Sequence, residues 1–481
     1  MDLGKFIQRF AVIFLATGLI MGASACTMGV EQAPEVIVLR GATLFDGTGG
    51  EALANSVIVV EDDRITCVGA EGDCSVPASA EEIDVSGKYI TPGLVDAHVH
   101  FFQTAFFDSR PDAMDLRDSL PYVETMAYQR QNPDRYYDAY LCSGITGVYD
   151  VGGFPWSVDL QASAEADPGA PHVAAAGPLV TPSTMQLLNT PADKTLVTLD
   201  SEETGRSTVK YLSALGATGV KLWQLDDDSE EYMNRVEAVA DEASQQGMQV
   251  IAHATSLSQA KAAMRNGTRL LVHSVSNMDV DQEFLDLARE QGTIYTPTLV
   301  VSSGYMLAYR AAAGVAGYPM NDPMQCVDSK TRDQLTGADR YSDHPRFSEG
   351  FLQALSNFNP ETDRLSEQDL ANLKAVYDAG LPIAVGTDAG NPGTLHGPSI
   401  FDEMEAMQQA GIPAADLIPM ATRNGADAMQ RLDDFGTVEA GKMANLLILD
   451  EDPSADIANM RSRQRVMIKG NLLQVDQIQE H

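Results

Sequence analysis

Basic side chains are scarce in this chain, and cysteine is rarer still. The sequence has 32 Lys and Arg against 68 Asp and Glu, so its formal net charge is −36. A surface of this sign repels a phosphate backbone, so nucleic acid is not expected as a partner. Internal repeats and low-complexity tracts are absent as well, and 44% hydrophobic with 21% charged residues excludes a disordered chain, a collagen and a coiled coil.

Long hydrophobic runs are also missing. An apolar stretch at residues 10–21 follows two basic residues and is shorter than the roughly 20 residues that cross a bilayer. This pattern is typical of a signal peptide over residues 1–25 and predicts an exported protein. Cleavage after Ala25 would release a soluble chain, whereas Cys26 resembles the acylated cysteine of a bacterial lipoprotein. The periplasm and the outer membrane therefore both stay open, with lipid on Cys26 as the only expected membrane attachment.

The five cysteines contain no C-x-x-C motif, so the sequence gives no sign of a cysteine zinc site. In an exported chain, however, thiols can oxidise. Cys67 and Cys74 lie seven residues apart at a predicted hairpin end and could pair across it. Cys142 and Cys326 could equally be free and buried.

Strands are predicted near both ends of the chain, at residues 36–39, 56–60, 64–69, 444–449 and 465–468. A linker over residues 26–35 precedes the first of them. We expect residues 36–91 and 435–475 to form one small composite β-sandwich domain.

Between these ends, residues 92–434 alternate short apolar strands with longer helices. Eight strands are expected, at residues 94–97, 147–149, 172–176, 219–223, 249–252, 270–273, 294–300 and 383–386. Helices expected at 230–246, 257–266 and 366–379 are each followed directly by Gly, as helix ends prefer. Eight such units predict an α/β fold, a (β/α)8 TIM barrel with insertions, rather than a doubly wound sheet.

Histidines gather at the C-terminal ends of the predicted strands, where TIM barrels place their active sites. His98 and His100 lie two apart on one strand, so both rings point to the same side. His253 and His273 end two further strands, and Asp388 ends the last. Any one of them could be an ordinary strand-end residue, but four of the eight histidines converging with a carboxylate indicate a divalent metal site.

Lys221 lies in the strand expected at 219–223 and would point into the end of the barrel. A bare ammonium there would be repelled by metal cations, unless the lysine is simply exposed at a strand edge. Carboxylated by carbon dioxide, the side chain becomes an anionic ligand that can bridge two metals about 3.5–4 Å apart. We therefore expect two divalent metal ions, with Zn2+ as the favoured metal, and a carboxylated Lys221.

The order of these residues resembles the metal-dependent amidohydrolase superfamily, in its imidazolonepropionase-like and prolidase-like branch, from about residue 38 to 470. The segments that carry the likeness are 41–47 (GATLFDG), 91–100 (TPGLVDAHVH), 386–390 (GTDAG), 421–426 (ATRNGA) and 436–442 (GTVEAGK). The resemblance implies that His98, His100 and Asp388 hold one metal. It implies that the other two histidines hold the second, with carboxylated Lys221 and a hydroxide as bridges. Asn445 departs from the family's usual Asp, in the predicted β-domain.

The resemblance also implies hydrolysis of an amide C–N bond in dipeptides or N-acyl amino acids. A metal-bridging hydroxide would attack, and Asp388 would act as general base and then general acid. Lactone, ester or phosphotriester hydrolysis on the same metals stays open, as does one-metal cyclic-amide chemistry of the imidazolonepropionase kind. A non-catalytic surface lipoprotein is a third interpretation, disfavoured because all six metal positions are intact.

The segment at residues 302–362 is polar and could be a lid over a small-molecule substrate, or a solvated insertion that binds nothing. Candidate substrate contacts are Tyr305, Tyr309, Arg310, His344 and, beyond the insertion, His396. The cations among them could pair with a substrate carboxylate. His172 is expected to pack at the third strand, and a homo-oligomer stays open.

Overall fold

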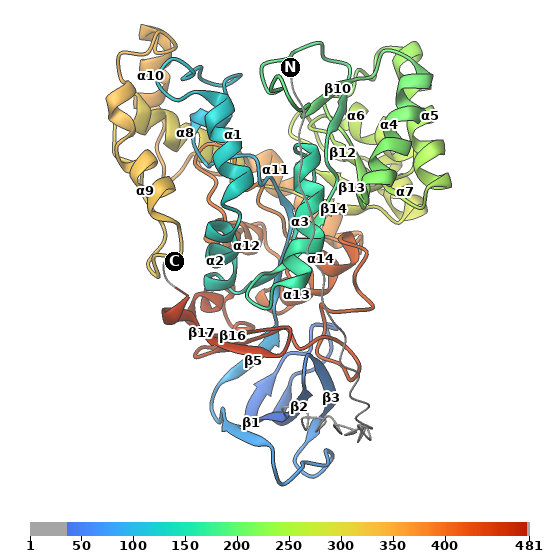
Figure 1. Cartoon of the computed structure of the whole chain (residues 1–481), viewed down its shortest axis with the longest axis vertical. Coiled ribbons are helices and arrows are strands. Elements are labelled where there is room, and N and C mark those ends of the chain that lie inside the picture. Colours follow the sequence, from blue (N-terminus) through green and yellow to red (C-terminus); the bar gives the residue numbers. More distant parts are fainter. Residues whose placement is uncertain (1–35, 479–481) are drawn as a thin grey trace, which may run out of the picture. The chain divides into compact units, whose positions relative to one another are not determined.

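The computed structural model describes residues 36–478, which form an α/β structure with parallel sheets (Figure 1). The predicted signal peptide, the linker and Cys26 lie outside the described residues. Among the described helices, none combines the length and the apolar character that crossing a membrane requires.

One eight-stranded sheet is built from both ends of the described chain. Its hydrogen-bonded order is β17 (Asn471–Gln474), β16 (Arg463–Ile468), β15 (Leu446–Leu449), β5 (Tyr89–Pro92), β1 (Val36–Leu44), β2 (Leu53–Glu61) and β3 (Arg64–Ala70), with β4 (Glu81–Asp84) paired to β1. Figure 1 shows the red strands β16 and β17 near the blue strands β5 and β1. The link is the antiparallel pairing of β5 with β15, in which Ile90 lies opposite Ile448. The strands predicted at the two ends of the sequence therefore lie in the same sheet.

Alternating side chains give this sheet its buried faces. Along β2, Ile58 and Val60 pack in a cluster that also contains Ile448 of β15. The alternate residues Val57 and Val59 pack in a second cluster. Because successive strand residues point to opposite faces, the apolar run of β2 is buried on both sides.

Two parallel sheets carry the remaining strands. The larger has the order β10 (Leu196–Thr198), β9 (Leu179–Thr181), β11 (Gly219–Leu222), β12 (Gln249–His253), β13 (Thr268–Val272) and β14 (Ile294–Thr296), and the smaller has the order β6 (Leu94–Val99), β7 (Ile145–Asp150) and β8 (His172–Ala175). Seven of the eight strands predicted for this region coincide with β6, β7, β8, β11, β12, β13 and β14. The sequence did not predict β9 and β10, which at three residues each are too short to show a period.

The prediction of an eighth strand at residues 383–386 is wrong, because this segment does not form a strand in the structure. It contributes one bridge, between Tyr295 and Ile383. A backbone hydrogen bond from Ala97 N to Val385 O, 2.9 Å long, holds the segment beside β6. Its pairing with β14 and β6 is too sparse to count as a strand.

The seventh strand is shorter than predicted. β14 ends at Thr296, because Pro297 has no N–H to give to a strand ladder and Thr298 adopts a left-handed φ of 49°. The chain then enters α8 (Val301–Ala312). This early turn brings the start of α8 to the strand ends.

Helices connect the parallel strands. They are α1 (Tyr122–Gln131), α2 (Asp134–Cys142), α3 (Pro155–Ala166), α4 (Glu202–Leu215), α5 (Glu230–Gln245), α6 (Leu257–Arg265), α7 (Gln282–Gln291), α11 (Glu367–Asp378), α12 (Ser399–Gln409), α13 (Ala414–Met420) and α14 (Arg423–Ala428). The three helices predicted from the sequence are α5, α6 and α11. Each begins after a serine, Ser229, Ser256 or Ser366, whose hydroxyl accepts a backbone N–H of the first turn.

The insertion at residues 302–362 is largely helical and has a core of its own. Besides α8 it contains α9 (Ser329–Thr336) and α10 (Glu349–Asn357). Leu335 and Leu355 from these helices pack with Phe106 and Phe107, which follow β6. The insertion is therefore a packed element rather than a solvated loop.

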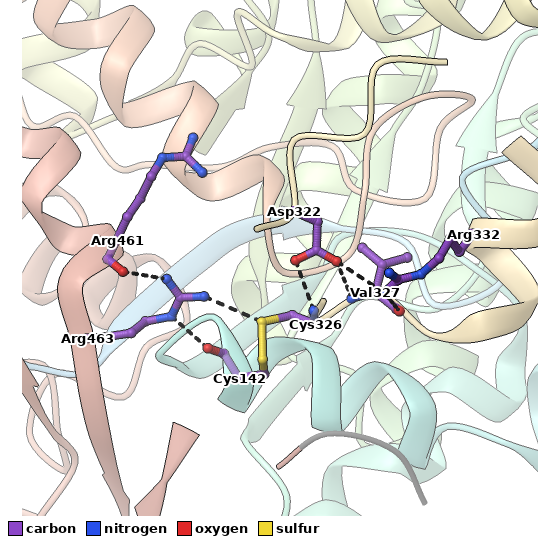
Figure 2. Close-up of a disulfide and its surroundings, with 7 residues drawn as sticks. All are labelled: Cys142, Asp322, Cys326, Val327, Arg332, Arg461 and Arg463. Atoms are coloured by element: carbon purple, nitrogen blue, oxygen red, sulfur yellow. Dashed lines mark hydrogen bonds and ion pairs between the residues drawn. A yellow bond between two sulfur atoms is a disulfide. The ribbon is translucent and has the colours of Figure 1, made fainter. Parts of the chain in front are cut away.

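Two disulfides join the four described cysteines, Cys67 with Cys74 and Cys142 with Cys326. The second ties the insertion to the end of α2 (Figure 2). Arg463 of β16 is buried against it and donates from Nε to the Cys142 carbonyl oxygen across 2.6 Å. The two cysteines of this disulfide are 184 residues apart, so no local pattern in the sequence reveals their pairing.

Removing the long-range disulfide should destabilise the protein more than removing the short one. The double variant C142A/C326A removes a cross-link between residues 184 positions apart, and C67A/C74A removes one between residues 7 positions apart. Loop-closure entropy predicts losses in the free energy of unfolding of about 5 and about 2 kcal/mol. Urea unfolding followed by circular dichroism measures both. Equal losses would show that the long-range bond does not restrain the unfolded chain as proposed.

Candidate metal centre

The six residues predicted as metal ligands come together in the structure. His98 lies in β6 and His100 follows it, Lys221 lies in β11, His253 ends β12, His273 follows β13 and Asp388 follows the 383–386 segment. The Oδ1 atom of Asp388 lies 3.3 Å from His98 Nε2 and 3.1 Å from His100 Nε2. Burial lowers the pKa of His98 far below its ordinary value, so this ring is neutral. Neutral imidazole nitrogens beside a carboxylate oxygen are an arrangement suited to sharing a cation.

The other two histidines lie in the same cluster. The ring centroids of His253 and His273 are 4.3 Å apart, and those of His98 and His273 are 5.0 Å apart. Donor atoms of His98, His273 and Asp388 all lie within 4.8 Å of one another. This group combines residues that the resemblance assigned to different metals, so the two expected metal positions are adjacent. Burial also lowers the pKa of His253 to about 3, which keeps its ring available as a ligand.

Hydrogen bonds orient two of the rings. His100 Nδ1 donates to the Gly152 carbonyl oxygen across 2.6 Å, and His273 Nδ1 pairs with Thr298 Oγ1 across 2.7 Å. The proton that His100 holds on Nδ1 leaves Nε2 of that ring as a lone-pair donor toward the cluster. The left-handed Thr298, two residues beyond the end of β14, thus also positions a predicted ligand.

Lys221 is buried in this cluster without a hydrogen bond. Its side chain is 1% exposed, and its Nζ has no partner among residues 36–478. Burial lowers the pKa of Lys221 to about 7. An uncharged amine is the form that adds carbon dioxide, and the product has the two oxygens that a bridging ligand needs.

Buried donor atoms without partners make the cluster suited to a metal ion. In the described part of the chain these include His98 Nδ1, His98 Nε2, Lys221 Nζ and Asp388 Oδ1. Buried polar atoms in folded proteins are normally hydrogen-bonded, and leaving one unpaired costs free energy. Nitrogen and oxygen donors of this kind suit Zn2+ and similar divalent ions. The residues present therefore fit a metal centre.

Two of the predicted ligands sit on strained backbone. His273 has φ of 76° and Asp388 has φ of 60°, a region that side-chain-bearing residues adopt rarely. Neighbouring strands hold both in place: His273 N donates to Thr296 O across 2.9 Å, and Asp388 N donates to His98 O across 2.7 Å. Strain retained at both positions is characteristic of a functional site.

Asp96 is bonded beside the cluster, and no separate role was predicted for it from the sequence. Its two carboxylate oxygens accept from Thr387 N at 3.0 Å and from Thr387 Oγ1 at 2.7 Å. Burial raises the pKa of Asp96 to about 7. These bonds join β6, which carries His98, to the segment that carries Asp388.

A pocket of about 330 Å³ opens at the cluster. Its lining comprises His100, Phe102, Gln103, Arg110, Leu179, Leu188, Thr195, Leu196, Lys221, Trp223, Gln224, His253, Thr255, His273, Val301, Ser302, Tyr305, Asp388 and Asn391. The sequence did not predict Arg110, Trp223 or Asn391 as site residues. Trp223 and Asn391 lie within three positions of predicted ligands and could have been found from that proximity, whereas Arg110 had no such signal.

Of the predicted substrate contacts, Tyr305 lines this pocket. The other four residues do not, because each is engaged elsewhere. Tyr309 donates to Ala113 O, Arg310 to Leu355 O, and His344 Nε2 pairs with Asp115 O; His396 is buried between Tyr140 and Gln103, with both ring nitrogens bonded. His172 packs on Phe435 beside β8, as expected for a residue of the third strand.

The sequence matches the Amidohydrolase family over residues 89–473, a range that includes the whole cluster. The chain belongs to the amidohydrolase family. This amidohydrolase is 23% identical over 432 residues to the imidazolonepropionase of Geobacillus sp. (strain WCH70), with 83% of this chain and 84% of that one covered. An adenine deaminase of Sinorhizobium fredii (strain NBRC 101917 / NGR234) is 40% identical over 72 residues, which cover 15% of this chain and only 12% of the deaminase.

Solved structures share the fold of this amidohydrolase over most of its length. A Xaa-Pro dipeptidase with bound methionine has a TM-score of 0.67 at 23% identity, with 92% of this chain and 100% of that chain covered. The A. niger ochratoxinase has a TM-score of 0.66 at 21% identity, with coverages of 92% and 96%. A molinate hydrolase has a TM-score of 0.65 at 22% identity, with coverages of 92% and 95%.

Proposed function

We propose that this amidohydrolase is a metal-dependent enzyme that hydrolyses an amide C–N bond in a small molecule. The observation that carries the proposal is the cluster of four histidines, Lys221 and Asp388, with unpaired buried donor atoms, at a pocket of about 330 Å³. Structural neighbours named as a dipeptidase, an ochratoxinase and a molinate hydrolase support it. The proposed substrates are dipeptides or N-acyl amino acids.

Two divalent metal ions would occupy the cluster, and we propose Zn2+. His98, His100 and Asp388 would hold one ion. The other two histidines would hold the second, and Lys221, carboxylated by carbon dioxide, would contact both. Such ions, when bound, polarise a carbonyl group and lower the pKa of a bound water.

Asp388 moves the proton in this proposal. Its Oδ1 faces His98 and His100 as the proposed ligand atom, so the other carboxylate oxygen would act as the base. It accepts a proton from the attacking water and returns it to the leaving nitrogen as the C–N bond breaks. Asn391 stabilises the backbone at Asp388, since its Nδ2 donates to the Asp388 carbonyl oxygen across 3.2 Å.

Hydrolysis by the metal-loaded protein tests this function. The purified chain is loaded with Zn2+ in bicarbonate and incubated with dipeptides, N-acyl amino acids, lactones, simple esters and a phosphotriester, and the products are quantified by chromatography. We expect amide cleavage that a chelator abolishes and added Zn2+ restores. Faster turnover of a lactone, ester or phosphotriester than of any amide would contradict the proposed reaction. Cleavage that survives the chelator would contradict the metal dependence.

We also propose that the two parallel sheets close into one (β/α)8 barrel, completed by the 383–386 segment. Hydrogen bonds between the sheets support closure, because Thr218 N donates to Ala175 O across 2.9 Å between β8 and the start of β11. The bond from Ala97 to Val385 supports it on the other side. The eight-stranded sheet would be the composite β-domain beside the barrel.

Export is part of the proposal as well. Two disulfides support it, because thiols oxidise readily outside the cytoplasm and are kept reduced within it. Mass spectrometry of the N-terminus of the mature protein would distinguish a soluble periplasmic chain from one acylated on Cys26. An uncleaved Met1 would contradict both.

A further inference from the structure

Arg110 brings a positive charge to the wall of the pocket from an unexpected part of the chain. It lies in the segment between β6 and α1, outside the insertion where the sequence predicted substrate-binding cations. Of the described residues that line the pocket, it is the only arginine, and its side chain is 15% exposed. The arginine on the pocket wall is therefore Arg110 rather than Arg310.

The guanidinium of Arg110 is held in a fixed orientation with donors to spare. Its Nε and Nη2 donate to the two oxygens of Asp112 at 2.9 and 2.8 Å, and its Nη1 donates to Asn391 Oδ1. Tyr305 supports the same group, since its hydroxyl donates to Asn391 Oδ1 across 2.8 Å and its ring lies 5.7 Å from the guanidinium carbon. These bonds use three of five N–H donors, so two remain for a ligand.

Asn391 also connects Arg110 to the reacting groups. Its side chain accepts from Arg110 and donates to the carbonyl oxygen of Asp388. One residue therefore links the guanidinium to the backbone of the proposed proton carrier. In an N-acyl α-amino acid, the carboxylate lies only three covalent bonds from the carbonyl carbon that is attacked. Arg110 and Asp388 line the same pocket, so a short substrate of this kind could contact both.

Among the described residues, the rest of the wall offers no free carboxylate to a substrate cation. Asp388 is the only acid among the described residues that line the pocket, and in this proposal it is a metal ligand. Asp112 is committed to Arg110 through both oxygens. Much of the remaining lining is apolar, with Phe102, Leu179, Leu188, Leu196, Trp223 and Val301. A free ammonium would lose its hydration here without gaining a counterion, which is unfavourable.

We propose that the substrate is an N-acyl α-amino acid with an uncharged, apolar acyl group, whose carboxylate binds Arg110, rather than a dipeptide with a free N-terminus. A planar guanidinium with two parallel donors matches a carboxylate in shape and charge. The pocket volume is at the small end for ligand sites, which suits one amino acid with a short acyl chain. This inference rests on the proposed amide-hydrolase function.

Three compounds that differ by one group each test it. N-(4-methylpentanoyl)-leucine, its C-terminal carboxamide and leucyl-leucine share one scissile amide; the carboxamide removes the carboxylate, and the dipeptide adds an ammonium. For the Zn2+-loaded wild type, we expect kcat/KM for the acyl-leucine to exceed both others by about tenfold or more. Comparable values for all three, or a preference for leucyl-leucine, would overturn the inference.

An Arg110→Gln variant links the preference to one side chain. We expect it to lower kcat/KM for acyl-leucine by about 100-fold, mainly through KM, and to lower that for the carboxamide much less. Arg110→Lys should retain part of the preference. Arg117→Gln is the matched control, because Arg117 lies in the same segment but pairs with Asp115 at the surface. Equal losses on acid and carboxamide would mean that Arg110 only positions Asn391 and Tyr305.

The wild-type comparison keeps the test valid if a variant is unstable, since it needs no substitution. Thermal unfolding of each variant shows whether a lost activity reflects lost fold. Failure of the metal-loaded wild type on every amide would contradict the hydrolase function itself. Hydrolysis of amides without preference for a carboxylate would contradict only the role of Arg110.

Discussion

Asp388→Asn is expected to lower kcat by about 100- to 10,000-fold while the metal content stays close to that of the wild type. Asparagine keeps the size of the side chain and one oxygen donor, but it cannot accept a proton at neutral pH. It also tolerates the left-handed backbone at this position better than most residues, so φ of 60° should persist. The variant therefore tests the role of Asp388 in proton transfer separately from its role in metal binding.

Turnover of the best amide substrate and metal per chain, measured by atomic emission on the same preparation, check this expectation. Asp286→Asn is the control, because Asp286 is exposed on α7 and pairs with Arg289. Activity near that of the wild type in Asp388→Asn would remove this residue from the role of general base. Loss of activity in step with loss of metal would reduce it to a ligand.

Lys221→Ala should have the second large effect, and it should lower the metal content of the protein. The wild-type protein prepared in bicarbonate is expected to bind about two metal ions per chain, as a bridged pair requires. Alanine removes the bridging oxygens and leaves a cavity in place of a side chain that is 1% exposed. We expect metal content to fall to about one ion or less, and amide hydrolysis to fall by at least about 100-fold.

Metal analysis and the amide assay, both carried out on the wild type and on Lys221→Ala, test this prediction. Lys210→Ala is a suitable control, because Lys210 lies on α4 with its side chain 60% exposed. One ion per wild-type chain, unchanged in Lys221→Ala, would favour one-metal cyclic-amide chemistry over the bridged pair. Absence of metal from active wild-type protein would contradict the proposed mechanism altogether.

The clustered residues could be found from the sequence because their placement depends on local rules. His98 and His100 share a face through the two-residue period of a strand. His253, His273 and Lys221 could be placed from short apolar runs alone, since the C-terminal ends of parallel strands meet on one side of a barrel. Even Asp388 was placed correctly at the cluster, although the segment before it is not a strand.

Local rules were insufficient for side chains whose environment depends on distant contacts. Arg310 lies in the insertion as predicted, but it donates to carbonyl oxygens at the end of α10 and not to the pocket. Arg110 reaches the pocket because its loop packs against Tyr305 and Asn391, which lie hundreds of positions away in the chain. The pairing of Cys142 with Cys326 is of the same kind.

The sequence by itself determined which residues gather at the candidate metal centre, because periodicity and apolar runs suffice to bring together four histidines, a lysine and a carboxylate. Only the tertiary structure decided which side chains form the wall of the pocket, and with them the proposed preference for a carboxylate over an ammonium. The physical reason is that strand registers follow from neighbouring residues, whereas the path of a loop follows from packing against elements far away in the chain.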